Sequence, residues 1–179
     1  MMPSGRIPES SIANELKCEK VVIQGLDKAS RPVMIVQVCK HNGWTRYIDE
    51  LERLCCYALD ALISRAPEDK NPGAQCSVVL DLTNMGALSM DIQAIKKLLQ
   101  LLGEHYVERL GVMYFFNPPS LFWGVWTSLS PLLPEPTRAK MKIIDPASDS
   151  HDLIQDIPRE VLPREFGGLA SMAPPLGRQ

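Results

Sequence analysis

One uncharged passage constrains what this chain can fold into more than any other feature. From Leu110 to Pro134 it runs for 25 residues without a charged side chain, whereas a membrane-spanning helix needs only about 20 apolar residues. Asn117, Pro118 and Pro119 fall near its middle, however, and proline removes a backbone donor and disfavours helix at the preceding residue. We therefore expect two elements, a buried strand followed by a short helix, rather than a membrane span.

The helix expected after this break, SLFWGVWTSLS, is apolar around most of its circumference. Its apolar residues are Leu121, Phe122, Trp123, Val125, Trp126 and Leu129, and none of its residues is charged. A helix that is apolar all round is either buried on every side or faces something apolar that is not protein. The pattern leaves both interpretations open: a central core helix, or a lid over a cavity that holds a lipid.

Short apolar runs bounded by turn residues predict the strands of a sheet. The expected strands cover residues 18–25, 33–40, 76–82, 109–117 and 140–144. The first two are expected to form a hairpin, and the later ones are separated by helical patterns. This order predicts an α/β fold with a mixed, mostly parallel sheet of about five strands flanked by helices.

Two further helices follow from periodicity and capping signals. One is expected over 44–65, where Trp44 and Tyr47 begin an apolar stripe. The other is expected over 90–102, with Ser89 as its cap and Gly103 as its stop. The polar residues 1–16 and the Pro/Gly-rich residues 169–179 are expected to be loose tails.

The bulk composition is that of a soluble globular protein, with 45% hydrophobic and 22% charged residues. A formal net charge of −2 gives no basic footprint for nucleic acid, and the N-terminus has no secretory signal pattern. The five cysteines are odd in number and are expected to be small buried thiols in a reducing compartment. We expect a cytoplasmic protein.

Catalytic and metal-binding patterns are missing from the sequence. Its three histidines form neither HExxH nor a Cys/His cluster, and it has no GxSxG elbow, GxGxxG turn or Walker loop. Cys39 and Arg46 resemble the ends of a cysteine-phosphatase loop, but six residues separate them where such a loop has five. We expect no enzyme, no metal and no cofactor.

The order of several motifs resembles the CRAL-TRIO lipid-binding family, and within it the phosphatidylinositol and phosphatidylcholine transfer proteins. The motifs are VVLDLTNMG, YVERLG, FFNPPSLFWGVW, LLPEPTRAKMKII and LPREFGG. The resemblance covers about residues 17–168, and the family's N-terminal helical lobe has no counterpart. It implies a sheet that floors an apolar cavity, closed by a gate helix over about 119–129.

The resemblance also implies which side chains contact the lipid. The gate positions that match the family are Phe122, Trp126 and Leu129. The positions that match its inositol phosphate contacts are Glu108, Thr137 and Lys140, with Arg109 in support. A carboxylate accepts from sugar hydroxyls, and an ammonium and a hydroxyl donate to phosphate. Without the resemblance, these side chains would equally suit a surface ion pair or an edge-strand charge.

The resemblance favours phosphatidylinositol over phosphatidylcholine. Serines that bind the choline headgroup in some family members correspond here to Cys76 and Leu102, which cannot do the same. We therefore expect a monomeric carrier of one phosphoglyceride, phosphatidylinositol or a relative, that makes transient, peripheral contact with membranes. The alternative is a CRAL-TRIO-like protein-interaction or regulatory module with no lipid exchange.

Overall fold

The computed structural model describes residues 7–106, 108–145 and 152–178. Five strands form one sheet in the order β1-β2-β3-β4-β5. They are β1 (Val21–Leu26), β2 (Pro32–Gln37), β3 (Cys76–Asp81), β4 (Leu110–Phe116) and β5 (Met141–Ile144). The first pair is antiparallel and the other three are parallel. The predicted mixed, mostly parallel sheet and its hairpin are confirmed.

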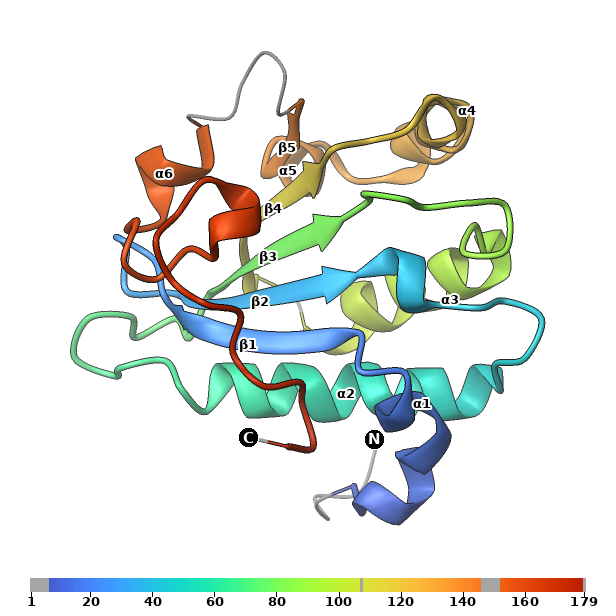
Figure 1. Cartoon of the computed structure of the whole chain (residues 1–179), viewed down its shortest axis with the longest axis horizontal. Coiled ribbons are helices and arrows are strands. Elements are labelled where there is room, and N and C mark those ends of the chain that lie inside the picture. Colours follow the sequence, from blue (N-terminus) through green and yellow to red (C-terminus); the bar gives the residue numbers. More distant parts are fainter. Residues whose placement is uncertain (1–6, 107, 146–151, 179) are drawn as a thin grey trace.

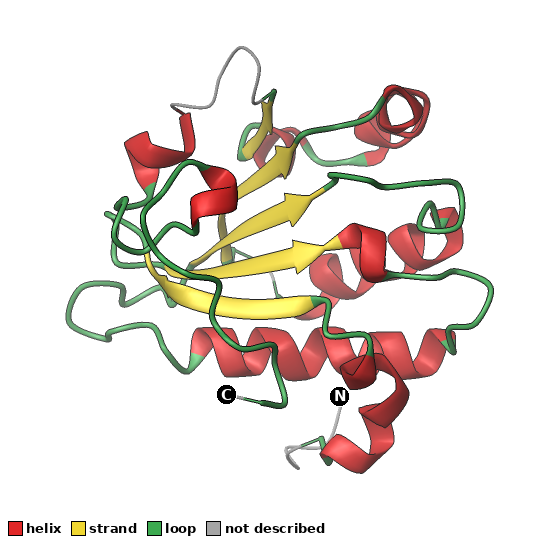
Figure 2. Ribbon diagram, viewed as in Figure 1, coloured by secondary structure: helices red, strands yellow, loops and turns green. Residues whose placement is uncertain are grey.

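The two faces of the sheet are covered by different parts of the chain. Helices α2 (Ile48–Ile63), α3 (Ile92–His105) and α4 (Ser120–Leu129) lie on one face, and α6 (Asp152–Asp156) lies on the other with the C-terminal segment (Figures 1 and 2). Side chains alternate accordingly: Val78 faces α2, while Val79 is fully buried on the α6 side. Because both faces of the sheet are covered, the strand sequences are continuous apolar runs rather than alternating ones.

The uncharged passage is split where the prolines predicted. Strand β4 ends at Phe116 and α4 begins at Ser120. Asn117 takes a left-handed conformation with φ of 52°, which asparagine tolerates better than most residues. None of the helices in the described part of the chain combines the length and hydropathy needed to cross a bilayer.

The helix predicted over 44–65 begins later than expected. Helix α2 starts at Ile48, and Trp44 and Tyr47 are 86% and 67% exposed. The prediction was wrong for these two residues because a turn precedes the helix. The Trp44 amide donates to Asn42 Oδ1 at 2.9 Å, and the Gly43 amide donates to the Leu88 carbonyl at 2.9 Å.

Helix α3 is capped by Asp91 rather than Ser89. The Asp91 carboxylate accepts from the Ala94 amide at 3.0 Å, which satisfies one of the unpaired donors at a helix start. Ser89 is buried two residues earlier and lies against the Cys39 carbonyl. Gly103 does not end the helix, which continues to His105.

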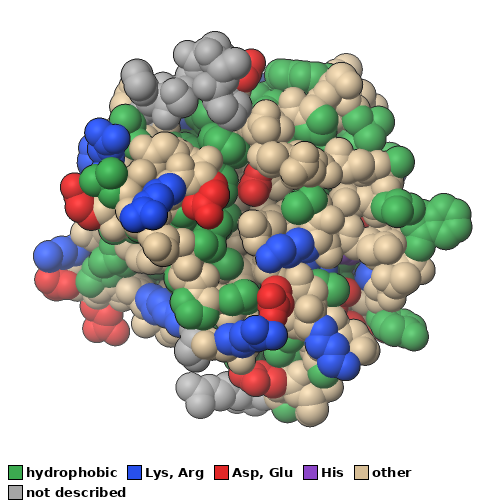
Figure 3. Space-filling view, viewed as in Figure 1, with side chains coloured by type: hydrophobic (Ala, Val, Ile, Leu, Met, Phe, Trp, Pro, Cys, Tyr) green, Lys and Arg blue, Asp and Glu red, His purple; other side chains and the backbone are tan. Residues whose placement is uncertain are grey.

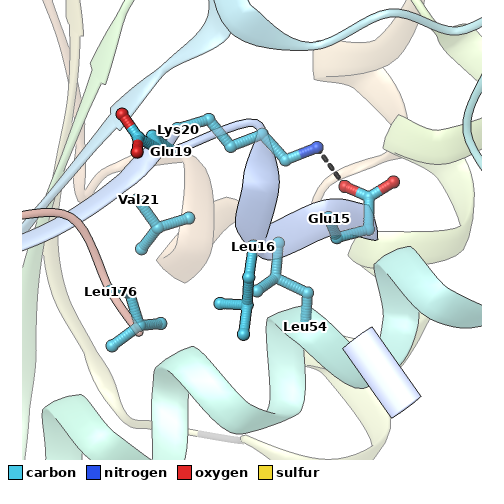
Figure 4. A pocket seen from close by; sticks show the side chains of 7 residues that line it. All are labelled: Glu15, Leu16, Glu19, Lys20, Val21, Leu54 and Leu176. Carbon is cyan, nitrogen blue, oxygen red and sulfur yellow. Dashed lines mark hydrogen bonds and ion pairs between the residues drawn. The ribbon is translucent and has the colours of Figure 1, made fainter. Parts of the chain in front are cut away.

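The predicted loose tails are wrong for the residues that the structure describes. Residues 9–17 form the 3-10 helix η1 (Glu9–Ile12) and α1 (Ala13–Lys17), and Ile12 is fully buried. At the other end, the Leu176 amide donates to the Val21 carbonyl at 2.8 Å. The Leu176 side chain joins Val21, Leu16 and Leu54 around a small pocket next to the buried Lys20–Glu15 ion pair (Figure 4).

The connections that return the chain to the sheet are short helices. After α4 come η3 (Ser130–Leu132) and α5 (Glu135–Arg138), and η2 (Val38–Lys40) follows β2. The LPREFGG motif forms η4 (Arg164–Phe166), and Gly167 ends it with φ of 85°. A side chain at Gly168 would collide with the Leu162 carbonyl, so the motif needs glycine there.

Candidate functional site

Helix α4 lies on the sheet through a cluster of three aromatic rings. The ring centroids of Phe122 and Trp126 each lie 5.2 Å from that of Phe115 on β4, and the two rings stack on each other at 5.9 Å. Phe122 and Leu129 are buried, and Trp126 is partly buried. The three predicted gate positions therefore share the inner side of a helix, and their role as a gate stays a prediction.

The sheet surface beside this cluster is apolar and incompletely covered. Leu80 lies on β3, the central strand, yet its side chain keeps part of its surface exposed, as do Met113 on β4 and Met141 and Ile143 on β5. Central strands of such a sheet are normally covered on both faces. We call this set of four residues the apolar floor.

The outer side of α4 carries two large apolar side chains among small and hydroxyl-bearing residues. Leu121 and Trp123 are about half exposed, and the helix carries no charged residue. Exposed apolar surface of this kind costs free energy in water and is a common mark of an interaction site. Helix α4 therefore carries large apolar side chains on both its inner and its outer side.

The predicted headgroup residues lie at the opposite end of the strands from α4. Glu108 and Arg109 precede β4, and Lys140 precedes β5. Because these strands are parallel, their amino ends share one edge of the sheet. The seven residues of β4 place this edge roughly 20 Å from the start of α4, at about 3.3 Å per residue.

The structure brings Lys140 close to the start of β4. Its ammonium donates to the Leu110 carbonyl at 2.8 Å, and the Lys140 amide donates to the Thr137 carbonyl at 3.1 Å. Thr137 and Lys140 thus belong to one turn. None of the ion pairs found among the described residues includes Lys140, and an ammonium has three donors, of which the bond to Leu110 uses one.

Glu108 and Arg109 differ in their surroundings. The Arg109 guanidinium donates to the Gly73 carbonyl at 2.7 Å, which commits it to the loop before β3. Glu108 is exposed and takes a left-handed conformation with φ of 64°, a costly arrangement that is enriched at functional sites. No contact between the Glu108 carboxylate and Lys140 is present among the described residues.

The buried thiols have the wrong environment for a nucleophile. Burial raises the pKa of Cys55 to about 12 and that of Cys76 to about 11, and only the thiolate is reactive. Cys18 and Cys39 are exposed, so the prediction that all five are buried was wrong for these two. Among the described residues, no group of three His, Cys, Asp or Glu side chains is placed to hold a metal ion.

A pocket of about 380 Å³ lies away from α4, along the outer strand β1. Its lining comes from β1, from the end of α2 and from the C-terminal segment: Ile23, Gln24, Gly25, Leu26, Arg65, Ala173 and Pro174. The small pocket in Figure 4 has no room for a water molecule. The apolar cavity expected under α4 stays a prediction, since aromatic rings meet there.

Comparison with known families decides where the chain belongs. The family model of the CRAL/TRIO domain matches residues 16–168 of the sequence, which is most of the chain. The chain belongs to the CRAL-TRIO family. CRAL-TRIO proteins are generally lipophile-binding and transfer proteins rather than enzymes, and the expected resemblance is confirmed at this level.

One solved structure shares the fold, and curated proteins share part of the sequence. The crystal structure of Sfh5 superposes with a TM-score of 0.65 at 17% identity, over 92% of this chain and 64% of that one. A CRAL-TRIO domain-containing protein of Schizosaccharomyces pombe is 28% identical over 89% of this chain and 35% of its own length. The mouse alpha-tocopherol transfer protein-like protein is 29% identical over 42% of this chain and 21% of its own. The chain thus spans about a third of the first relative.

Sequence reasoning missed Phe115, on which the inner face of α4 rests. Phe115 and Phe116 are adjacent in β4, so their side chains point to opposite faces of the sheet. Phe116 packs on Phe166 in the C-terminal segment, at a ring distance of 4.9 Å. The alternation within the strand carried this signal, because Phe115 lies on the same face of β4 as Met113, which packs against the same cluster under α4.

Proposed function

We propose that this CRAL-TRIO domain binds one phosphoglyceride, phosphatidylinositol, between α4 and the apolar floor, and exchanges it at the cytoplasmic face of membranes as a monomer. The observation that carries the proposal is the uncharged helix α4, with large apolar side chains on both sides, above an incompletely covered sheet. Its inner face would contact acyl chains, and its outer face would contact the bilayer when the lipid enters.

Hydration explains why such a carrier needs an enclosing helix. Removing an acyl chain from water is worth about 0.8 kcal/mol for each CH₂, so one long chain contributes on the order of 10 kcal/mol. A lipid that has left the bilayer stays out of contact with water only while protein covers its acyl chains. Methionines around the site suit this purpose, because Met85, Met113 and Met141 are unbranched and can repack around a ligand.

The headgroup would lie at the amino edge of β4 and β5. Lys140 offers two further donors and a positive charge to the phosphodiester, and Thr137 on the same turn adds a hydroxyl. Glu108 would accept from inositol hydroxyls. Arg109 would act by holding the loop before β3, since its guanidinium bonds to Gly73. The headgroup residues lie roughly 20 Å from α4, so the acyl chains would extend along the apolar floor toward α4.

One observation favours a second function, a protein-interaction module without lipid exchange. The rings of Phe115, Phe122 and Trp126 meet directly beneath α4. If this packing never opens, acyl chains cannot enter between α4 and the floor, and the exposed side of α4 would serve a protein partner. The two functions differ in whether lipid enters.

Lipid extraction tests the proposal. The purified chain is incubated with vesicles of mixed phospholipids, separated from them, and its bound lipid is identified by mass spectrometry. We expect one phosphatidylinositol per chain, and Lys140→Ala should weaken binding at least tenfold, because bonds to charged groups contribute about 1.5–3 kcal/mol. Lys142→Ala is the matched control, since Lys142 lies on β5 and pairs with Asp156 at 2.7 Å. Absence of bound phospholipid would favour the interaction module.

A further inference from the structure

Most exposed large apolar side chains of the described residues gather at one end of the molecule. Of eight such side chains, six come from three separate segments: Trp44, Tyr47, Leu88, Ile92, Leu121 and Trp123. We call these six the aromatic rim. The other two are Leu26, the last residue of β1, and Leu169 in the C-terminal segment.

The topology of the sheet explains why the three segments meet. Residues 41–47 follow β2, residues 82–92 follow β3, and α4 follows β4. These three strands are parallel neighbours, so their carboxyl ends open onto the same edge. Figure 1 shows the arrows of β2, β3 and β4 pointing to this side, and Figure 3 shows hydrophobic side chains standing out there.

The loop that carries Trp44 is held by hydrogen bonds from residues before and after Trp44 in the sequence. The Arg46 guanidinium donates to both Asp91 carboxylate oxygens, at 2.7 and 3.1 Å, and His41 Nε2 lies 3.3 Å from the same carboxylate. The Gly43 amide donates to the Leu88 carbonyl, which joins this loop to the next. Trp44 therefore projects into solvent from a turn with fixed ends.

The rim segments have no net charge. Residues 41–47 contain one charged side chain, Arg46, and residues 82–92 contain one, Asp91. These two pair with each other and are largely buried, and residues 117–134 contain none. These three segments therefore supply neither the basic patch that binds acidic lipids nor the charges that select a charged protein partner.

We infer that the aromatic rim docks on the surface of an electrically neutral bilayer, with Trp44 and Tyr47 as interfacial anchors beside α4. Tryptophan and tyrosine favour the membrane interface because each has an apolar ring and a polar group. A bilayer accepts separate protruding tips, whereas a tight protein interface needs a closely packed, complementary patch. The inference rests on the proposed function, because it places the bilayer against the helix through which the lipid would enter.

Vesicle binding tests the inference with a matched pair of variants. Leu88 and Leu169 are both 55% exposed, but only Leu88 belongs to the rim. Leu88→Ser should weaken binding to phosphatidylcholine vesicles and Leu169→Ser should not. Trp44→Ala should lower the partition coefficient about tenfold, because an aromatic side chain leaves water. Raising ionic strength from about 0.05 to about 0.5 M should change binding little. Thermal unfolding checks that each variant folds.

A second assay separates this inference from the proposed function. Short-chain phosphatidylinositol dispersed as monomers can enter the lipid site without a bilayer, so its binding should be equal in the natural chain and in Trp44→Ala. Lipid binding without rim-dependent vesicle binding overturns the docking inference alone. Rim-dependent vesicle binding without short-chain lipid binding overturns the proposed function alone. If the chain forms a dimer that Trp44→Ala dissociates while vesicle binding is unchanged, the rim joins two copies and the inference is wrong.

Discussion

Replacing Phe122 by alanine should loosen α4 without loosening the sheet. Phe122 is 6% exposed and contacts the rings of Phe115 and Trp126. Truncating a core phenylalanine costs about 3–5 kcal/mol, and we take about 3 kcal/mol because α4 lies at the periphery of the core. If α4 opens without the rest of the protein, the substitution lowers the free energy of this local opening by the same amount. The open form of α4 should then be on the order of a hundredfold more populated.

Native-state hydrogen exchange measures this opening directly. In Phe122→Ala, amides of α4 should exchange faster by that factor, while amides of β3 should change much less. Phe166→Ala is the control, because Phe166 is equally buried and packs on Phe116 across the opposite face of the sheet. Phe166→Ala should leave the protection of the α4 amides relative to that of the β3 amides unchanged. Equal acceleration of α4 and β3 in Phe122→Ala would refute the reasoning, since α4 would then be part of one cooperative core and could not act as a gate.

Three other perturbations have defined outcomes. Asp27→Ala should lower the free energy of unfolding in urea by about 3 kcal/mol, because the buried Asp27 carboxylate accepts four hydrogen bonds; the exposed Asp69→Ala should not. Burial, and then Lys20, lower the pKa of His41, so the unfolded chain binds a proton first and stability should fall as pH drops below about 6.5; an unchanged slope in His41→Gln would contradict this. Glu108→Gly should not lower stability, because it removes a left-handed penalty of about 1 kcal/mol, yet it should weaken phosphatidylinositol binding.

Much of the fold could be predicted because the decisive signals are local. Asn117 and the two prolines after it separate β4 from α4 whatever the rest of the chain does. The runs of β-branched residues in β2 and β3 likewise mark strands. Such features act within a few residues, and the structure agrees with them.

The wrong predictions concern choices that only tertiary contacts decide. Trp44 fits the helical stripe of α2, but the bond between Gly43 and Leu88 turns the chain before the helix begins. Ser89 and Asp91 are both good caps, and Asp91 is used because Arg46 also binds its carboxylate. Residues before Leu16 show no strong structural pattern in the sequence, and they are ordered by Glu50 on α2, which accepts from the backbone amides of Asn14 and Glu15.

The candidate site shows the same division. Periodicity identified α4 as apolar all round but left its surroundings open, because a core helix and a lid have the same pattern. The half-exposed Trp123 and the floor beneath Trp126 come from the packing of α4 on β4. Membership of the CRAL-TRIO family, over residues 16–168, supports the class of ligand that we propose, which the residues alone did not indicate.

Photo-crosslinking of bound lipid tests the central claim most directly. A phosphatidylinositol with a photoreactive group near the end of one acyl chain should label α4 or Phe115. The same group on the inositol ring should label residues near Glu108 and Lys140, at the amino edge of the sheet. Labelling of the β1 pocket around Gln24 by either probe, or of α4 by the headgroup probe, would contradict the proposed position and direction of the lipid.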